Sequence, residues 1–338
     1  MDCQKKIFGC IAGAAIGDAM GAATETRTMD MIYRDFNGWV TSIVPPPDDC
    51  FARGRPAGTV TDDFSLAYFT AWELAKSGGR VSEAAAKKVL LDWADHSNFY
   101  VFAGPTTRAA IDRLRGIDVP DPEAYLACNN HRATNGAAMK IFGAGLINPG
   151  DLDKTIYDTF TLCAPTHPYN AALSGACAVS CAVSKAMEEN ADLGDVFHAG
   201  LYGAKKGYSL ATEQGLLCAA PSIEKRILLA VDIAQRGLGW EKTMRELAEV
   251  VGSGLSAAES IPTVFGILEA TSGDPMGAIT MGVNIGNDTD TIATIAGAVA
   301  GALNGMVSLR YEDISLIEQV NQMDLMGLST QIWEAYYS

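Results

Sequence analysis

The stretch GNDTDTIATIAGAVAGALNG (residues 286–305) decides the fold, because it joins a dense acidic motif to a helix that carries a glycine ladder. Gly297, Gly301 and Gly305 follow one another at a spacing of four residues, which places them on one face of a helix. A glycine inside a helix costs about 1 kcal/mol relative to alanine, so a ladder of them needs a reason. We therefore expect this face to contact another helix whose backbone approaches closely.

A second glycine ladder occurs near the other end of the chain, in GCIAGAAIGDAMGAATE (residues 9–25), again with a spacing of four residues. A membrane span is the competing interpretation for residues 292–306. That segment is too short to cross a bilayer, is rich in small residues and directly follows acidic residues. We predict that the two laddered helices lie at the centre of the protein and hold the acidic residues at their ends in register.

The rest of the chain has helical periodicity nearly everywhere. The pattern predicts helices over residues 3–22, 62–77, 82–95, 105–116, 136–146, 152–163, 168–188, 195–206, 223–235, 240–252, 258–270, 274–284, 289–305 and 312–336, the last in two pieces. Residues 39–44 are the one candidate strand. No linker marks a domain boundary, and 48% hydrophobic residues supply ample core. We predict one all-α domain over residues 1–338.

The charge and the cysteines narrow the class of protein. A net charge of −15 without a basic face disfavours general nucleic-acid binding. The eight cysteines form no CxxC pair and fit no zinc module, so a reduced, cytoplasmic protein is predicted. Lys5 and Lys6 precede an apolar run that resembles a signal peptide, but Asp18 ends the run without a separate cleavage site. We expect no membrane attachment, and the oligomeric state is not predicted.

Two motifs of Asp and Thr open predicted helices: TDD (residues 61–63) and DTDT (residues 288–291). Helix capping explains the first motif on its own, since Thr and Asp are favoured at helix starts. In the second motif two carboxylates and two hydroxyls exceed what a cap requires, and the carboxylates would repel one another without a cation. Hard oxygen ligands at this density suit Mg²⁺, Mn²⁺ or Ca²⁺ and do not suit zinc. An EF-hand is excluded, because Ala293 and Val299 occupy its glycine and bidentate-acid positions.

The two motifs together predict one centre that holds two ions, the arrangement that activates a water and binds a substrate oxygen. Asp18 interrupts an apolar helical face, which is costly unless the carboxylate is paired or borders a polar pocket. Glu25 lies at the end of the same predicted helix, where a carboxylate opposes the helix dipole. We therefore predict that Asp18 and Glu25 both face the metal centre.

The combination of motifs resembles the ADP-ribosylglycohydrolase family, which includes the dinitrogenase-reductase-activating glycohydrolase. The matching segments are GDAMG (17–21) with Glu25, TDD (61–63), GPTT (104–107), NGAAMK (135–140), TH (166–167) and DTDT (288–291). They occur in the family's order and extend over nearly the whole chain. The resemblance implies a compact, single-domain orthogonal helical bundle with two Mg²⁺ or Mn²⁺ ions at the bottom of a cleft.

The implied activity is hydrolysis of the glycosidic bond at C1″, the anomeric ribose carbon, of an ADP-ribosyl conjugate. The implied metal ligands are Thr61, Asp62, Asp63, Asp288, Asp290 and Thr291, and the implied catalytic residues are Asp62, Asp63, Glu25 and Asp290. The implied substrate contacts are Asp18, Phe102, Gly104, Thr106, Asn135, Gly136, Met139 and His167. Asn135 and Gly136 would open a helix toward the pyrophosphate. Lys140, where many relatives carry Arg, would offer a cation to a phosphate.

The sequence also departs from the family. Residues 100–104 lack the acid that arginine-directed members tend to place there, and Phe64 stands where many relatives carry Thr or Ser. We expect Phe99, Tyr100 and Phe102 to form an aromatic rim suited to stacking on a base. Three functions stay open: hydrolysis of an ADP-ribosyl conjugate, hydrolysis of a smaller N-riboside such as a nucleoside, and non-catalytic binding of ADP-ribose. The leaving group and the choice between Mg²⁺ and Mn²⁺ are not predicted.

Overall fold

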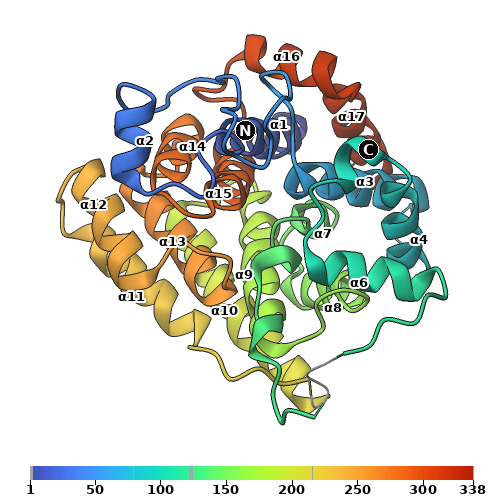
Figure 1. Cartoon of the computed structure of the whole chain (residues 1–338). Coiled ribbons are helices and arrows are strands. Elements are labelled where there is room, and N and C mark those ends of the chain that lie inside the picture. The colour runs from blue at the N-terminus through green and yellow to red at the C-terminus, as the bar shows by residue number, and fades with distance from the viewer. Residues whose placement is uncertain (1–2, 79, 122–124, 215, 338) are drawn as a thin grey trace.

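A computed structural model of the chain describes residues 3–78, 80–121, 125–214 and 216–337, and these form seventeen α-helices and no strand (Figure 1). The all-α prediction is confirmed. The first helices are α1 (Cys3–Gly21), α2 (Met29–Asp35), α3 (Asp62–Ser77), α4 (Glu83–Ala94), α5 (Ser97–Tyr100), α6 (Pro105–Leu114), α7 (Phe142–Leu146) and α8 (Leu152–Cys163). They are followed by α9 (Asn170–Ala186), α10 (Leu193–Glu213), α11 (Ile223–Gln235), α12 (Trp240–Glu246), α13 (Ala257–Ala270), α14 (Pro275–Asn284), α15 (Thr289–Asn304), α16 (Tyr311–Asn321) and α17 (Leu325–Tyr336). Shorter helical segments are η1 (Asn130–Arg132), η2 (Asn135–Ala137) and η3 (Leu247–Val251).

Helices α1 and α15 lie side by side near the centre of the view (Figure 1). They run in antiparallel directions, since Gly9 meets Gly305 and Gly21 meets Asp290, and both helices are almost completely buried. A methyl group on Gly13 would collide with the carbonyl of Gly297, and one on Gly21 would collide with the backbone of Asp290. The two glycine ladders therefore form one backbone contact, as predicted. Since Gly21 faces Asp290, this register brings the end of α1 beside the start of α15.

The other helices are arranged around this pair. Helix α14 lies against α15, where Gly282 leaves room for the backbone of Ala293. Helices α9 and α10 pack in a similar way, with Gly203 against the carbonyl of Cys177. One continuous cluster of buried apolar residues extends along the chain from Ile7 to Ile332. Such a shared core is what the predicted single domain requires, and the domain assignment itself stays a prediction.

Two predicted elements differ in the structure. Residues 39–44 form no strand, because the backbone N–H and C=O of Val40 are both satisfied by the side-chain amide of Asn284, at 2.8 Å each. The helix predicted over residues 136–146 is replaced by the short η2 and α7. The seven-residue helix α2 and the four-residue helix α5 were not predicted from the sequence. None of the described helices is long and apolar enough to cross a membrane.

Candidate active site

A cavity of about 510 Å³ brings both acidic motifs together with segments that are distant in the sequence. Its lining residues are Glu25, Thr26, Phe51, 61–63, 101–107, 134–136, Met139, His167, Leu255, Asn287, Asp288, Asp290 and Thr291. The implied metal ligands, catalytic residues and substrate contacts all belong to this set, with the exception of Asp18. The described part of the lining contains no Lys or Arg. The described lining is therefore rich in carboxylates and offers no basic side chain to a ligand.

Thr61 and Asp18 both form hydrogen bonds at the start of α3. Thr61 is the N-cap of α3, and its hydroxyl accepts a hydrogen bond from the Asp63 N–H at 3.3 Å. Asp18 is fully buried and accepts the backbone N–H groups of Thr61 and Phe64, each at 2.9 Å. The Thr61 hydroxyl also donates to Asp18 at 2.8 Å. Asp18 thus anchors the helix that carries Asp62 and Asp63, and it does not line the cavity, in contrast to the prediction that it binds substrate.

The start of α15 is tied by its backbone to the segment that follows α1. The Thr26 N–H donates to the Asn287 carbonyl, and the Asn287 N–H donates to the Arg27 carbonyl, both at 2.7 Å. Asn287 has a φ of 67°, a left-handed conformation that asparagine tolerates better than most residues. This backbone pairing is what places Glu25 next to Asp288.

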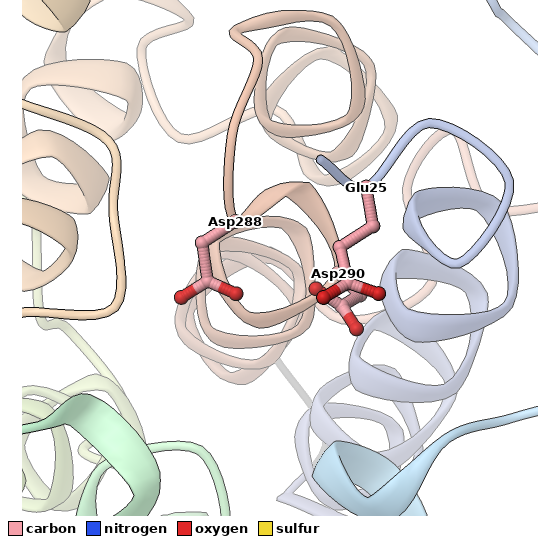
Figure 2. A group of neighbouring side chains, drawn as sticks. All are labelled: Glu25, Asp288 and Asp290. Carbon is pink, nitrogen blue, oxygen red and sulfur yellow. The ribbon is translucent and has the colours of Figure 1, made fainter. Parts of the chain in front are cut away.

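Five carboxylates form the acidic cluster of the cavity: Glu25, Asp62, Asp63, Asp288 and Asp290. Oxygen atoms of Glu25, Asp288 and Asp290 all lie within 4.8 Å of one another. Figure 2 shows Glu25 reaching the pair from the segment after α1, whereas Asp288 and Asp290 project from the start of α15. Three separate segments therefore converge on one point.

Burial is the main cause of the perturbed pKa values in this cluster. Burial, followed by the charge of Asp290, raises the pKa of Asp62 to about 7 and that of Glu25 to about 10. Burial, again followed by Asp290, also raises the pKa values of Asp63 and Asp288 well above their usual range. These carboxylates are thus destabilised in their charged form unless positive charge is added.

The residues present fit a divalent cation. One carboxylate oxygen of Asp63 is buried and has no hydrogen-bond partner among the described residues. Carboxylates and the hydroxyls of Thr61 and Thr291 are the hard oxygen donors that Mg²⁺ and Mn²⁺ prefer. A cation would satisfy the orphaned oxygen and offset the repulsion within the cluster. The cluster therefore has the donor set of a divalent-metal site.

Asn135 lines the cavity, and its side chain also binds one of the predicted metal ligands. The three-residue turn η2 gives it no helix start that could bind a pyrophosphate. Its side-chain amide instead donates to Asp288, and also to Ser260 at 3.0 Å. The Asn135 N–H donates to the Leu255 carbonyl at 3.0 Å, which ties this loop to the segment before α13. Asn135 thus orients a predicted metal ligand.

Residues 101–104, which we call the wall, line the cavity between α5 and α6. Of the three aromatic residues predicted to form a rim, Phe102 alone lines the cavity. The Phe99 ring packs near Phe69 with centroids 6.3 Å apart, and the Tyr100 ring contacts Trp93 at 5.9 Å. Because consecutive residues of a helical turn point in different directions, these three rings do not share a face.

His167 lines the cavity as predicted, whereas two other residues do not reach it. The ring of His167 lies directly against Gly136, where a Cβ would approach Nε2 to 2.8 Å. Burial lowers the pKa of His167 to about 3, with Lys140 adding to the effect, so the ring is neutral. Lys140 is buried and donates to Thr166 at 2.9 Å, so it is not a phosphate contact. Phe64 is fully buried and stacks near Phe142 in the core.

Several lining residues were missed from the sequence. Phe51 and Leu255 are apolar yet each is 64% exposed, and Val101 is also exposed. With Phe102 they make an apolar part of the cavity lining. A single apolar residue in a predicted loop carries no signal of a site. Asn287 is the exception, since it directly precedes the acidic motif DTDT, where a polar side chain is itself a signal.

Comparisons with known proteins agree with this geometry. The family described as ADP-ribosylglycohydrolase matches residues 1–338. Over 336 residues the chain is 29% identical to the protein YegU of Escherichia coli (strain K12), covering 97% of this chain and 96% of that protein. It is 26% identical over 340 residues to ADP-ribosylhydrolase ARH3 of Bos taurus, covering 95% and 91% respectively.

A solved structure of an ADP-ribosylglycohydrolase-related protein complex has the same fold. Its TM-score is 0.62 and its sequence identity 18%, with 99% of each chain covered. The prediction of this fold and of the family is confirmed, and the family favours an enzyme over a non-catalytic binding protein. The chain belongs to the ADP-ribosylglycohydrolase family and is a glycosylhydrolase that acts on ribosyl bonds.

Proposed function

We propose that this protein is a divalent-metal-dependent hydrolase that cleaves the glycosidic bond at C1″ of an ADP-ribosyl conjugate. The observation that carries the proposal is the convergence of five carboxylates on one cavity whose described lining has no basic side chain. The name of the ARH3 relatives supports ADP-ribose as the substrate moiety. Two Mg²⁺ or Mn²⁺ ions would be held by Thr61, Asp62, Asp63, Asp288, Asp290 and Thr291.

Metal binding and proton transfer are assigned to different residues of the chain. When bound, the divalent ions would supply Lewis-acid polarisation of ribose oxygens and a lowered pKa for the attacking water. We assign the proton transfer to Glu25 rather than to Asp62 or Asp63. The described residues donate no hydrogen bond to its carboxylate, which lies within the cavity and is free to take the proton from water. Asp290 and Asp288 would stay deprotonated as ligands.

The substrate lies against the rest of the cavity. A volume of about 510 Å³ falls within the range of small-molecule sites. Gly104, Thr106, Gly136, Met139 and the neutral His167 would contact it. The pyrophosphate of ADP-ribose would rely on bound cations and backbone N–H groups for its charge, since the described lining offers no Lys or Arg.

That lack of basic side chains favours a second candidate, hydrolysis of a smaller N-riboside such as a nucleoside. The apolar residues Phe51, Val101, Phe102 and Leu255 would suit the face of a base. The same residues disfavour arginine as the leaving group, because the wall carries no carboxylate for a guanidinium.

The decisive experiment compares substrates under one set of conditions. Purified protein with Mg²⁺ or Mn²⁺ is incubated with peptides ADP-ribosylated on Ser or Arg, with ADP-ribosylated nucleic acid and with free nucleosides. Release of ADP-ribose from the Ser or nucleic-acid conjugates is the expected result, whereas release of ribose from nucleosides alone would select the second candidate. The Asp290→Ala variant should release neither. Binding of ADP-ribose without cleavage of any substrate would overturn the catalytic proposal.

A further inference from the structure

We infer that Arg108 is a positioning residue that clamps the wall of the cavity in its binding conformation. Arg108 is not among the residues that line the cavity, although its positive charge acts on the Asp62 carboxylate and lowers the pKa of that group. The Nε group donates to the Ala103 carbonyl at 2.7 Å. The Nη2 group donates to the carbonyls of Tyr100 and Val101, at 3.0 and 2.8 Å. One side chain therefore holds three carbonyl oxygens within a four-residue segment.

The wall needs such a clamp because of the helix that precedes it. Helix α5 has a single turn, and carbonyls at the end of a helix lack partners within the helix. A turn this short is not stable by itself. The planar fork of arginine presents several donors at fixed angles, which matches a cluster of carbonyls, whereas lysine presents a single point charge. The arrangement thus requires arginine and not merely a positive charge.

Arg108 is itself held in place. The Tyr100 ring lies 4.8 Å from its guanidinium carbon, and Trp93 contacts that ring edge-on at 5.9 Å. The described residues offer its guanidinium backbone carbonyls and this ring, and no carboxylate ion pair. Tyr100, which was predicted to contact substrate, therefore holds the Arg108 guanidinium in place through its ring.

The clamped segment reaches the site at two points. The Phe102 ring lines the cavity and packs against Ala22, Cys50 and Ala52, while the Arg55 guanidinium lies over it at 5.8 Å. Gly104, at the other end of the wall, presents its backbone to the Asp62 carboxylate. Fixing the carbonyls of residues 100, 101 and 103 therefore also fixes the Phe102 ring and the backbone neighbour of Asp62.

The first test measures the clamp without any substrate. Amide hydrogen exchange of residues 100–104 is compared in the wild type, Arg108→Ala, Arg108→Lys and the control Arg113→Ala, an exposed residue of the same helix. We expect exchange in both Arg108 variants to accelerate by at least about tenfold, the factor that corresponds to one lost hydrogen bond to a charged donor. The control should match the wild type. Wild-type exchange in both Arg108 variants would overturn the inference.

The second test is kinetic and rests on the proposed function. The KM of the cleaved substrate should rise in both Arg108 variants by a larger factor than kcat falls. Methylguanidinium added to Arg108→Ala should restore KM in part and should not affect Arg113→Ala. An Arg108→Lys enzyme with wild-type KM would show that charge suffices, and would contradict the clamp. If the wild type cleaves none of the substrates, the proposed function fails, while the exchange measurement still decides the role of Arg108.

Discussion

The acidic cluster and the wall face the same cavity but are held in place by different means. The acidic cluster is attached to helices whose backbones touch, since Gly21 of α1 faces Asp290 at the start of α15. The wall is a short segment held by the side chains of Arg108 and Arg55. A backbone contact allows little adjustment, because a close-packed interior resists any change in volume. A side-chain clamp can be altered while the surrounding helices stay in place.

This difference separates the residues that would hold ions from the residues that would contact the leaving group. The groups that would hold ions need accurate placement, and they lie where the fold itself would have to change before they could move. The groups that would meet the leaving group lie on a connecting segment, where substitutions are tolerated best. Members of one family can then share a metal centre and differ in their leaving groups.

The largest expected effect comes from breaking the helix contact. Gly13→Leu would drive a side chain into the carbonyl of Gly297, and we expect loss of the folded protein or a large fall in Tm. Overpacking in a core typically costs about 1–3 kcal/mol and more where backbone blocks relaxation. Gly104→Ala in the wall is the contrast, because no atom lies within 4 Å of the added Cβ. Thermal melting of both variants checks the comparison, and a stable Gly13→Leu protein would refute it.

The next effect separates catalysis from folding within the acidic cluster. Asp290→Asn should reduce kcat at least about 10²-fold, beyond the loss usual for an outer-shell partner. In EDTA at pH 8 the same variant should melt at a higher temperature than the wild type, because it removes a charge that raises the pKa values of five neighbours. Asparagine can still accept the Thr291 N–H, which Asp290 accepts at 3.0 Å. A lower Tm in EDTA would contradict the repulsion argument.

A smaller effect tests the support behind the cluster. Asn135→Ala should weaken Mg²⁺ or Mn²⁺ affinity by roughly 10–100-fold, as expected for an outer-shell partner of a metal ligand. The reason is that its amide donates to Asp288 and fixes that carboxylate. Ser260→Ala is the control, since Ser260 contacts Asn135 but not Asp288. Isothermal titration with the metal measures both, and equal affinities in all three proteins would remove Asn135 from this role.

The smallest expected effect is the pH dependence of stability without metal. The folded protein raises the pKa of Asp62 to about 7, Asp18 to about 8 and Glu25 to about 10, while their unfolded values are near 4. The folded state then binds more protons than the unfolded state, so stability is full below about pH 4 for these groups and falls as pH rises. Each of these groups should lower the Tm by about 2 °C per pH unit within its own titration range, since one proton corresponds to about 1.4 kcal/mol per pH unit and the chain has 338 residues.

Melting curves in EDTA between pH 5 and pH 9 measure this fall in Tm, because that range is centred on the pKa of Asp62, about 7. Saturating Mg²⁺ should flatten the curve, because metal binding favours the deprotonated carboxylates. Asp290→Asn should flatten it as well. A wild-type Tm in EDTA that rises over the same range would show that the cluster is not repulsive.

Sequence reasoning predicted the helix starts well and the roles of supporting residues poorly. Thr61 and Asp288 could be placed at helix starts because capping depends on neighbours within a few residues. The sequence singled out Asp18 as unusual, whereas the family resemblance implied substrate contacts for both Asp18 and Asn135. Their partners, Thr61 and Asp288, lie far away in the chain, and no local pattern encodes such a contact. The prediction that Tyr100 belongs to an aromatic rim was wrong for the same reason, since the direction of its ring depends on Trp93 and Arg108.

The sequence by itself determined the all-α class, the two glycine ladders and the two acidic motifs, because helix periodicity, glycine spacing and capping are local properties. The tertiary structure alone decided that Gly21 meets Asp290, that Asp18 anchors α3 and that the Arg108 guanidinium binds three backbone carbonyls beside the cavity. These outcomes depend on which helices approach one another and on which polar groups become buried together. Burial then requires each of those groups to find a partner, and the partner is chosen in space rather than along the chain.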